Sequence, residues 1–299
     1  MTRSRWMITG AMFAIVVAGI AFRLLQSDDR PDSTVAAASI PEDAPRAATQ
    51  RNAALLDAPF DSVRSELETA ARGGDAAAAY RLGMAVARCM QYTPITSSRF
   101  DRMLSEAAAA GNGVIRIGAR ALGDDETIDL LLYAHGEQSR LCADTERLRA
   151  DPPKENAFHW VAMAAERGYG PAMAAYGDVA FVEFTDDAAL AGNASEVARR
   201  RERGKTLLYT AVAAGEPDAF MASARAHAVD GWLTPDPVLA YTHLLAYFET
   251  PDAARLPDSL RRDVQATYAR DLSTDDRRQA EADAAMLLSR RGAGTEVTP

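Results

Sequence analysis

Side chains that could perform catalysis are few and scattered in this sequence. No two of the four histidines are spaced to share a metal ion on one helix turn: His135, His159, His227 and His243. We expect His159, next to Trp160, to be a hydrogen-bonded packing residue. The acidic runs Asp124-Asp125-Glu126 and Asp186-Asp187 could serve a glycosidase only if folding brought two carboxylates face to face. Between helices, where we expect them, such residues are solvated caps.

Motifs for nucleotide and hydrolase chemistry are also missing. Gly204-Lys205-Thr206 imitates the end of a phosphate-binding loop, but the first glycine of that loop would fall at Arg199 and no strand precedes it. The chain contains no Gly-x-Ser-x-Gly, no His-Glu-x-x-His and no calcium-loop spacing. The sequence therefore predicts a protein that is not an enzyme, with no catalytic residue, no metal ion and no cofactor.

A pattern of alanine and glycine residues, which we call the register, recurs along the chain. It predicts that any site is positioned by paired helices. It reads Ala-Ala, then Gly three residues on, Ala four further on and Gly five further on, over residues 70–83 and again over 164–177. A third copy lies around Gly215, ends on Ala224 instead of Gly, and keeps Ala211, Ala214 and Ala219. Such self-similarity is typical of repeat proteins, whose hairpins stack because none can bury its apolar face alone.

Each copy predicts two antiparallel helices joined by a tight turn. Alanines four residues apart let the neighbouring helix approach closely, and a glycine at the turn tolerates positive φ (Gly74, Gly168, Gly215). Asp75, Pro171 or Pro217 then helps to start the second helix.

The same residues resemble a known family. The segment from Phe158 to Gly168 is similar to the first helix and turn of a Sel1-like repeat, a relative of the tetratricopeptide repeat. Residues 231–236 followed by Ala240 resemble the Gly-x-x-x-x-Asp loop and next-helix alanine of that family. The resemblance covers Val63 to Glu249 and implies an all-α fold, an α-solenoid of helical hairpins, with adaptor or scaffold function.

The spacing of the copies departs from the family. Gly74 and Gly168 are 94 residues apart, whereas Gly168 and Gly215 are 47 apart, so longer helices or insertions must exist. Residues 106–111 are the candidate for a degraded copy, although Ile115 replaces the expected Ala and Arg120 the expected Gly. An ordinary alanine-rich helical domain is the alternative interpretation.

The start of the chain predicts export. Arg3 and Arg5 precede an uncharged run of 17 residues, Trp6 to Phe22, and no small-x-small cleavage site follows at once. We expect an uncleaved signal anchor, a transmembrane helix, over 1–26, with a cleaved signal helix as the alternative. Residues 27–56 predict a disordered tether, 57–291 the solenoid domain, and 292–299 a disordered tail. The folded domain would lie in a bacterial periplasm, held at the inner membrane or secreted after cleavage.

Export also bears on the two cysteines, Cys89 and Cys142. They form no Cys-x-x-Cys pair, and two isolated thiols lack the other ligands of a metal site. In an oxidising compartment we expect a disulfide between them, which stabilises by about 4 kcal/mol through loop closure. Free buried thiols are the alternative.

Composition agrees with closely packed helices. Aromatic residues are 7% of the 299 residues, and no run alternates like a strand beyond the four residues 114–117. The net charge of −9 argues against nucleic acid or an anionic membrane surface as partner. The basic cluster over residues 199–205 is interpreted as a solvated face or as ion-paired with Glu196 and Glu202. Residues 257–271 and 274–290 predict two final helices, the second capped at Ser273 or Thr274.

These observations favour a membrane-tethered periplasmic interaction module that binds a protein or peptide on a concave surface lined by the first helices. Tyr80, Tyr176 and Tyr209 could line such a groove, or could equally belong to the core. The alternatives are an exported enzyme or inhibitor acting on cell-wall carbohydrate, and a structural spacer of the envelope.

Overall fold

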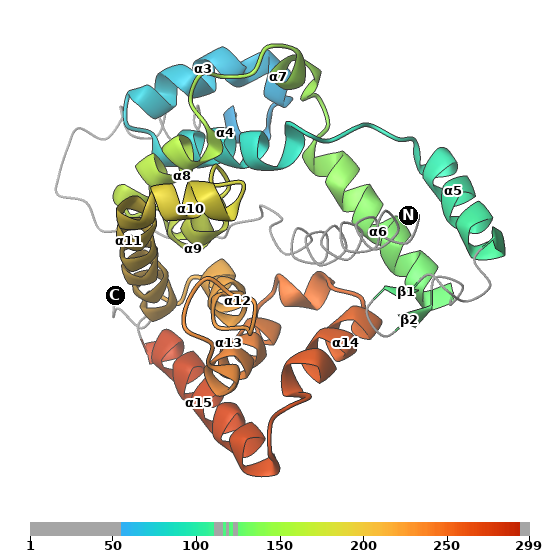
Figure 1. Cartoon of the computed structure of the whole chain (residues 1–299), viewed down its shortest axis with the longest axis vertical. Coiled ribbons are helices and arrows are strands. Elements are labelled where there is room, and N and C mark those ends of the chain that lie inside the picture. Colours follow the sequence, from blue (N-terminus) through green and yellow to red (C-terminus); the bar gives the residue numbers. More distant parts are fainter. Residues whose placement is uncertain (1–54, 111–115, 118–119, 122–124, 294–299) are drawn as a thin grey trace. The chain divides into compact units, whose positions relative to one another are not determined.

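The computed structural model describes residues 55–110, 116–117, 120–121 and 125–293 (Figure 1). This part of the chain is helical apart from one antiparallel pair of two-residue strands, β1 (Arg116–Ile117) and β2 (Arg120–Ala121). The predicted all-α class is therefore confirmed. The expected anchor over 1–26 and nearly all of the expected tether lie outside the described residues, and within the described ranges no helix is long and apolar enough to cross a membrane.

The described chain divides into two compact units inside the single domain that we expected over 57–291. The smaller unit consists of Tyr92–Ala143 and Pro251–Val264. The larger consists of residues 55–91, 144–250 and 265–293. The larger unit contains all three copies of the register.

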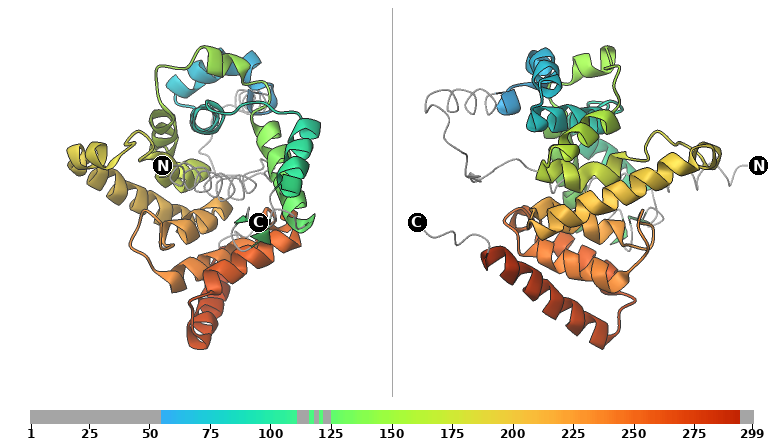
Figure 2. Two further views of the ribbon diagram at one scale, coloured as in Figure 1. Left: turned by 45° about the vertical axis from the view of Figure 1, so that its right-hand side comes forward. Right: turned by 90° about the vertical axis from the view of Figure 1, so that its left-hand side faces the viewer.

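Each copy forms the helical hairpin that its sequence predicts (Figure 2). The pairs are α3 (Phe60–Arg72) with α4 (Ala76–Cys89), α8 (Ala157–Glu166) with α9 (Gly170–Val179), and α11 (Ala194–Ala213) with α12 (Pro217–Ala226). The turn glycines Gly74, Gly168 and Gly215 have φ values of 104°, 78° and 74°, so a side chain there would be strained.

All three turns close with the same two hydrogen bonds. In the first, the Gly74 N–H donates to the Ala71 carbonyl and the Asp75 N–H to the Ala70 carbonyl, which is the pattern of a Schellman motif. The equivalent amides of the second and third turns donate to equivalent carbonyls (Ala165, Ala164, Val212, Ala211). Asp75 caps the following helix, and proline opens α9 and α12, as expected.

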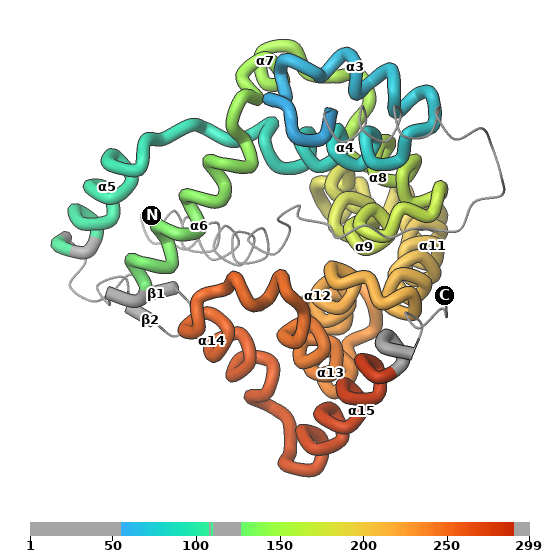
Figure 3. Tube along the Cα trace, turned by 180° about the vertical axis from the view of Figure 1, so that it is seen from behind, coloured from blue at the N-terminus to red at the C-terminus, as the bar shows by residue number. Residues whose placement is uncertain are grey.

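Within the larger unit the hairpins pack in series. Helix α4 lies against α8, α9 against α11 and α12, α12 against α13 (Pro237–Phe248), and α13 against α15 (Thr274–Ala293) (Figure 3). Helix α4 can approach α8 so closely because residue 83 is glycine. A Cβ on Gly83 would lie 2.6 Å from Val161 Cγ2 and 3.0 Å from the Val161 backbone nitrogen. The largest side chains of this core are fully buried: Trp160, Tyr176, Tyr247 and Phe220.

Because α4 packs directly on α8, the first two hairpins are neighbours, and residues 106–111 are not a copy between them. Residues 106–110 belong to α5 (Ser97–Ala110), which packs with α6 (Asp125–Leu141) in the smaller unit, and residue 111 lies outside the described residues. The spacing of 94 residues therefore reflects an insertion of about one helical pair. Helix α6 ends at Leu141, and α7 (Glu146–Ala150) is a separate short helix that packs on α3 and α4.

Shorter elements and the end of the chain complete the description. They are α10 (Asp187–Gly192), the 3₁₀ turn Ala253–Arg255 and α14 (Asp258–Ala269). The start of α15 confirms the expected cap: the Asp276 N–H donates to Ser273 Oγ, and Ser273 returns its own N–H and hydroxyl to the Asp276 carboxylate.

Candidate protein-binding surface

The residues that could do chemistry are not brought together. Among the described residues no group of three or more His, Cys, Asp or Glu could hold a metal ion. His159 is exposed rather than packed by a hydrogen bond, and His135 lies in the smaller unit, 3.0 Å from the Ile95 carbonyl oxygen. Asp186 accepts the Ala189 N–H at 2.7 Å and so caps α10, as expected for an acidic pair between helices.

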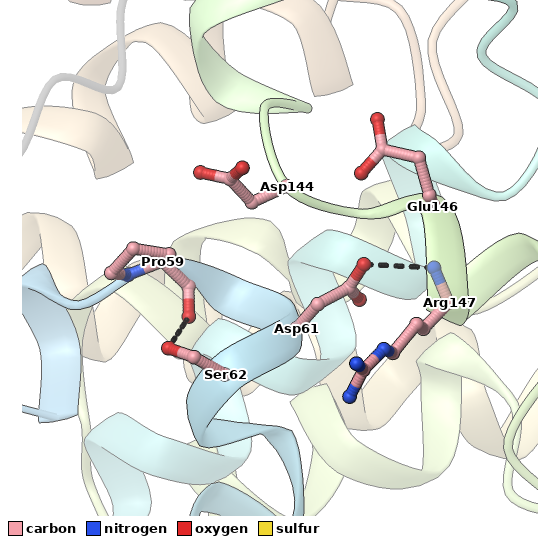
Figure 4. A pocket seen from close by; sticks show the side chains of 6 residues that line it. All are labelled: Pro59, Asp61, Ser62, Asp144, Glu146 and Arg147. Atoms are coloured by element: carbon pink, nitrogen blue, oxygen red, sulfur yellow. Dashed lines mark hydrogen bonds between the residues drawn. The ribbon is translucent and has the colours of Figure 1, made fainter.

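Three carboxylates do line one shallow, open pocket of about 290 Å³, with Pro59, Ser62 and Arg147 (Figure 4). They belong to Asp61, Asp144 and Glu146. The Asp61 carboxylate accepts the backbone N–H groups of Arg147 at 2.8 Å and Leu148 at 3.3 Å. It therefore caps the first turn of α7 and joins that helix to α3, which is a structural role.

Neither cysteine is free. Cys89 and Cys142 are both disulfide-bonded, as the sequence predicts, and the chain has no other cysteine. Their side chains are buried, with exposed fractions of 0% and 1%.

The most exposed large apolar side chains of the described residues share one repeat position. Val182 is 68% exposed and Val229 is 81% exposed. Each lies 14 residues after the turn glycine of its hairpin, beyond the end of the second helix. In the first hairpin the same position holds Arg88, which is buried, so the pair is confined to the second and third hairpins.

Two aromatic residues that lie near the valines in the sequence contact each other. The rings of Phe181, next to Val182, and Trp232, three residues after Val229, have centroids 6.1 Å apart. Both rings are half-buried, as is that of Phe184. We name Phe181, Val182, Phe184, Val229 and Trp232 together the hairpin-end surface.

Two glycines fix the position of Trp232. A Cβ on Gly177 of α9 would overlap the indole ring, and one on Gly204 of α11 would lie 3.1 Å from it. The indole is thus inserted against the backbones of two helices. Gly177 and Gly83 are equivalent, since each is the last glycine of its copy of the register. In the first copy this glycine allows α4 to pack on α8, and in the second it allows Trp232 to pack on α9.

Arg200 contacts the segment of the hairpin-end surface that follows α9. Its guanidinium lies 3.8 Å above the Phe158 ring and 5.1 Å above the Phe184 ring. It donates to the Ala180 carbonyl at 2.7 Å and pairs with Glu183 at 2.5 Å and Glu196 at 2.7 Å. Because Arg200 is buried and satisfied on all sides, it fixes the chain that carries Val182.

In the rest of the basic cluster, Arg199 pairs with Glu196 as expected, whereas the other expected partner, Glu202, forms no ion pair among the described residues. Hydrogen bonds from Arg199 and then Arg200 lower the pKa of the Glu196 carboxyl to about 2. Arg203 pairs with Glu166 of α8, a partner that the sequence did not suggest.

Tyr209 and His227 tie down the loop that carries Val229. The His227 Nδ1–H donates to the Thr234 carbonyl at 3.0 Å, which leaves Nε2 to accept the Tyr209 hydroxyl at 2.9 Å. Burial, with the Asp236 carboxylate, raises the pKa of Tyr209, so its hydroxyl keeps the proton it donates. Of the three tyrosines considered for a groove, Tyr176 is core, Tyr80 is half-buried, and Tyr209 is the exposed one at 37%.

No family model, curated protein or solved structure matches the chain.

Proposed function

We propose that the chain is a non-enzymatic protein-binding module, in which hairpins of Sel1-like type form an α-solenoid and the hairpin-end surface contacts an apolar segment of a partner protein. The observation that carries the proposal is the placement of Val182 and Val229 at one repeat position of neighbouring hairpins, joined by the Phe181–Trp232 contact. The binding surface that we propose is therefore at the ends of the second helices rather than on the first helices.

Physical chemistry supports such a role for this surface. Isolated exposed valines are ordinary, but both valines belong to segments that also carry half-buried aromatic rings, and apolar and aromatic residues together with arginine match the composition of interface cores. Energetically dominant interface residues are enriched in Trp, Tyr and Arg. The glycine contacts of Trp232 and the ion pairs of Arg200 hold the surface in place before binding, which lowers the entropy cost of association.

The N-terminal sequence supports a location for this module. The charged start and the uncharged run from Trp6 to Phe22 favour a single-pass anchor in a bacterial inner membrane, with the folded part in the periplasm. A tether of about 30 residues would let the module search tens of ångströms for its partner.

The test is copurification of the tagged full-length protein from membranes of its host. In the variant Val182→Asp/Val229→Asp, recovery of the partner should fall at least about tenfold, because two charges would have to be desolvated at the contact. Both valines are exposed, so the substitutions leave the fold intact.

Met286→Asp is the matched control, since Met286 of α15 is 50% exposed and lies outside the hairpin-end surface. It should retain the partner at the wild-type level. Undiminished recovery with the valine variant, or an equal loss with Met286→Asp, would contradict the proposed surface.

A further inference from the structure

The described helices α5 and α6 of the smaller unit share a small apolar cluster. Leu104 of α5 and Leu131 of α6 are its buried members, with exposed fractions of 4% and 3%. Partly buried apolar residues surround them: Phe100, Ala107, Ile128 and Leu132. A cluster of this size holds two helices together only weakly, and a covalent link adds to its stability.

The face of α6 that carries this core continues as a polar face toward the helix end. His135 Nε2 lies 3.0 Å from the Ile95 carbonyl oxygen, and its ring stacks on Phe100 at 4.2 Å. One turn later, Ser139 Oγ and the Tyr92 hydroxyl are hydrogen-bonded at 2.7 Å. These contacts attach residues 92–100 to α6 near its C-terminal end.

The disulfide lies at the end of the same face. Cys142 directly follows the last residue of α6, and Gln138 Nε2 donates to its sulfur at 2.9 Å. Cys89 is the last residue of α4, just before the chain leaves the hairpins. The cross-link therefore closes the loop of chain that contains α5 and α6.

The contacts that pack the described hairpins against one another lie within the larger unit. Helix α4 meets α8 directly, through Gly83 and Val161, and the turns of all three hairpins are closed by local hydrogen bonds. A loop closed by a cross-link at its base, with a core of its own, can unfold separately.

We propose that α5 and α6 form a disulfide-held insertion that unfolds as its own cooperative unit when the disulfide is reduced, while the hairpins stay folded. A dithiol supplies the two electrons: its sulfurs form a new disulfide, and Cys89 and Cys142 leave as two thiols that take up its two protons. The insertion is thus a redox-responsive segment attached to a redox-independent module.

Hydrogen exchange of the full-length oxidised protein, before and after dithiothreitol, tests this proposal. Losing the cross-link should lower amide protection in α5 and α6 about a thousandfold, the equivalent of the loop-closure stabilisation. Protection in α8, α9, α12 and α13 should stay within about threefold. The variant Cys89→Ala/Cys142→Ala should show the same pattern. Because it lacks the disulfide altogether, it tests the proposal even if dithiothreitol does not reach the buried disulfide.

Two results overturn the inference. One is an equal loss of protection in the hairpin helices, which would make the molecule a single cooperative unit. The other is unchanged protection of α5 and α6 in the alanine variant.

Discussion

Lowering the pH from 7 to 4 is expected to destabilise the fold by about 3 kcal/mol through one imidazole, that of His243. This side chain of α13 is 4% exposed, and its Nδ1 has no hydrogen-bond partner among the described residues. Burial, followed by repulsion from His227, lowers the pKa of His243 to about 4, and the Asp236 carboxylate opposes that shift only weakly.

The sign follows from the depressed pKa. In the unfolded chain the imidazole binds its proton near pH 6.5, whereas the folded state resists protonation until about pH 4. The unfolded state therefore carries more protons in this window, and the free energy of unfolding falls as the pH drops through it. Well below pH 4 both states are protonated and the contribution of His243 stays constant.

Urea denaturation at pH 4, 5, 6 and 7 checks this for wild type and His243→Leu. The variant should lose about 3 kcal/mol less than the wild type between pH 7 and 4. At pH 7 it should be at least as stable, because a buried polar atom without a partner is replaced by an apolar group. His159→Gln changes an exposed imidazole and should keep the wild-type profile. Parallel profiles for wild type and His243→Leu would contradict the assignment.

The contact between Trp232 and Gly177 predicts that Gly177→Ala destabilises the wild type but stabilises the Trp232→Ala variant. Trp232→Ala alone should cost about 3 kcal/mol of unfolding free energy, because the ring fills the space against α9 and α11. Gly177→Ala alone should cost about 2 kcal/mol, since its Cβ would overlap the indole. In the Trp232→Ala background the same change should instead stabilise by about 1 kcal/mol, the helix preference of alanine over glycine.

Gly136→Ala is the control for helix preference. Gly136 lies within α6, and a Cβ there would have no atom within 4 Å, so alanine should stabilise α6 in either background. Additive effects of Gly177→Ala and Trp232→Ala would mean that the two residues do not press on each other.

Local signals explain which parts of the fold the sequence could predict. The turn glycines, the prolines of α9 and α12, and the cap at Ser273 are interactions between residues a few positions apart, and all were found as expected. The disulfide was predictable because the chain offers one possible pairing. The final helices were expected from their periodicity and lie within a few residues of the expected bounds.

Contacts between distant residues were not predictable. The spacing of 94 residues predicted an insertion or longer helices, and an insertion is found, but the spacing does not say whether the added chain forms a further hairpin of the stack. Arg200 was expected at a solvated or ion-paired face, and Glu196 was correctly named. Its burial over Phe158 and Phe184 depends on how α8 and α11 pack.

The hairpin-end surface leaves a trace in the sequence. Val182 and Val229 are equivalent once the copies are aligned on Gly168 and Gly215. Equivalence alone does not reveal exposure, because Arg88 occupies the same position in the first copy and is buried. Only the packed hairpins distinguish these cases.

The most direct measurement of the central claim is site-specific photocrosslinking in host cells, with a photoreactive amino acid in place of Val182, Val229 or, as control, Met286. A protein-binding role for the hairpin-end surface predicts one and the same crosslinked partner from positions 182 and 229, and none from 286. Crosslinks from 286 alone, or none from 182 and 229 in abundant folded protein, would contradict it.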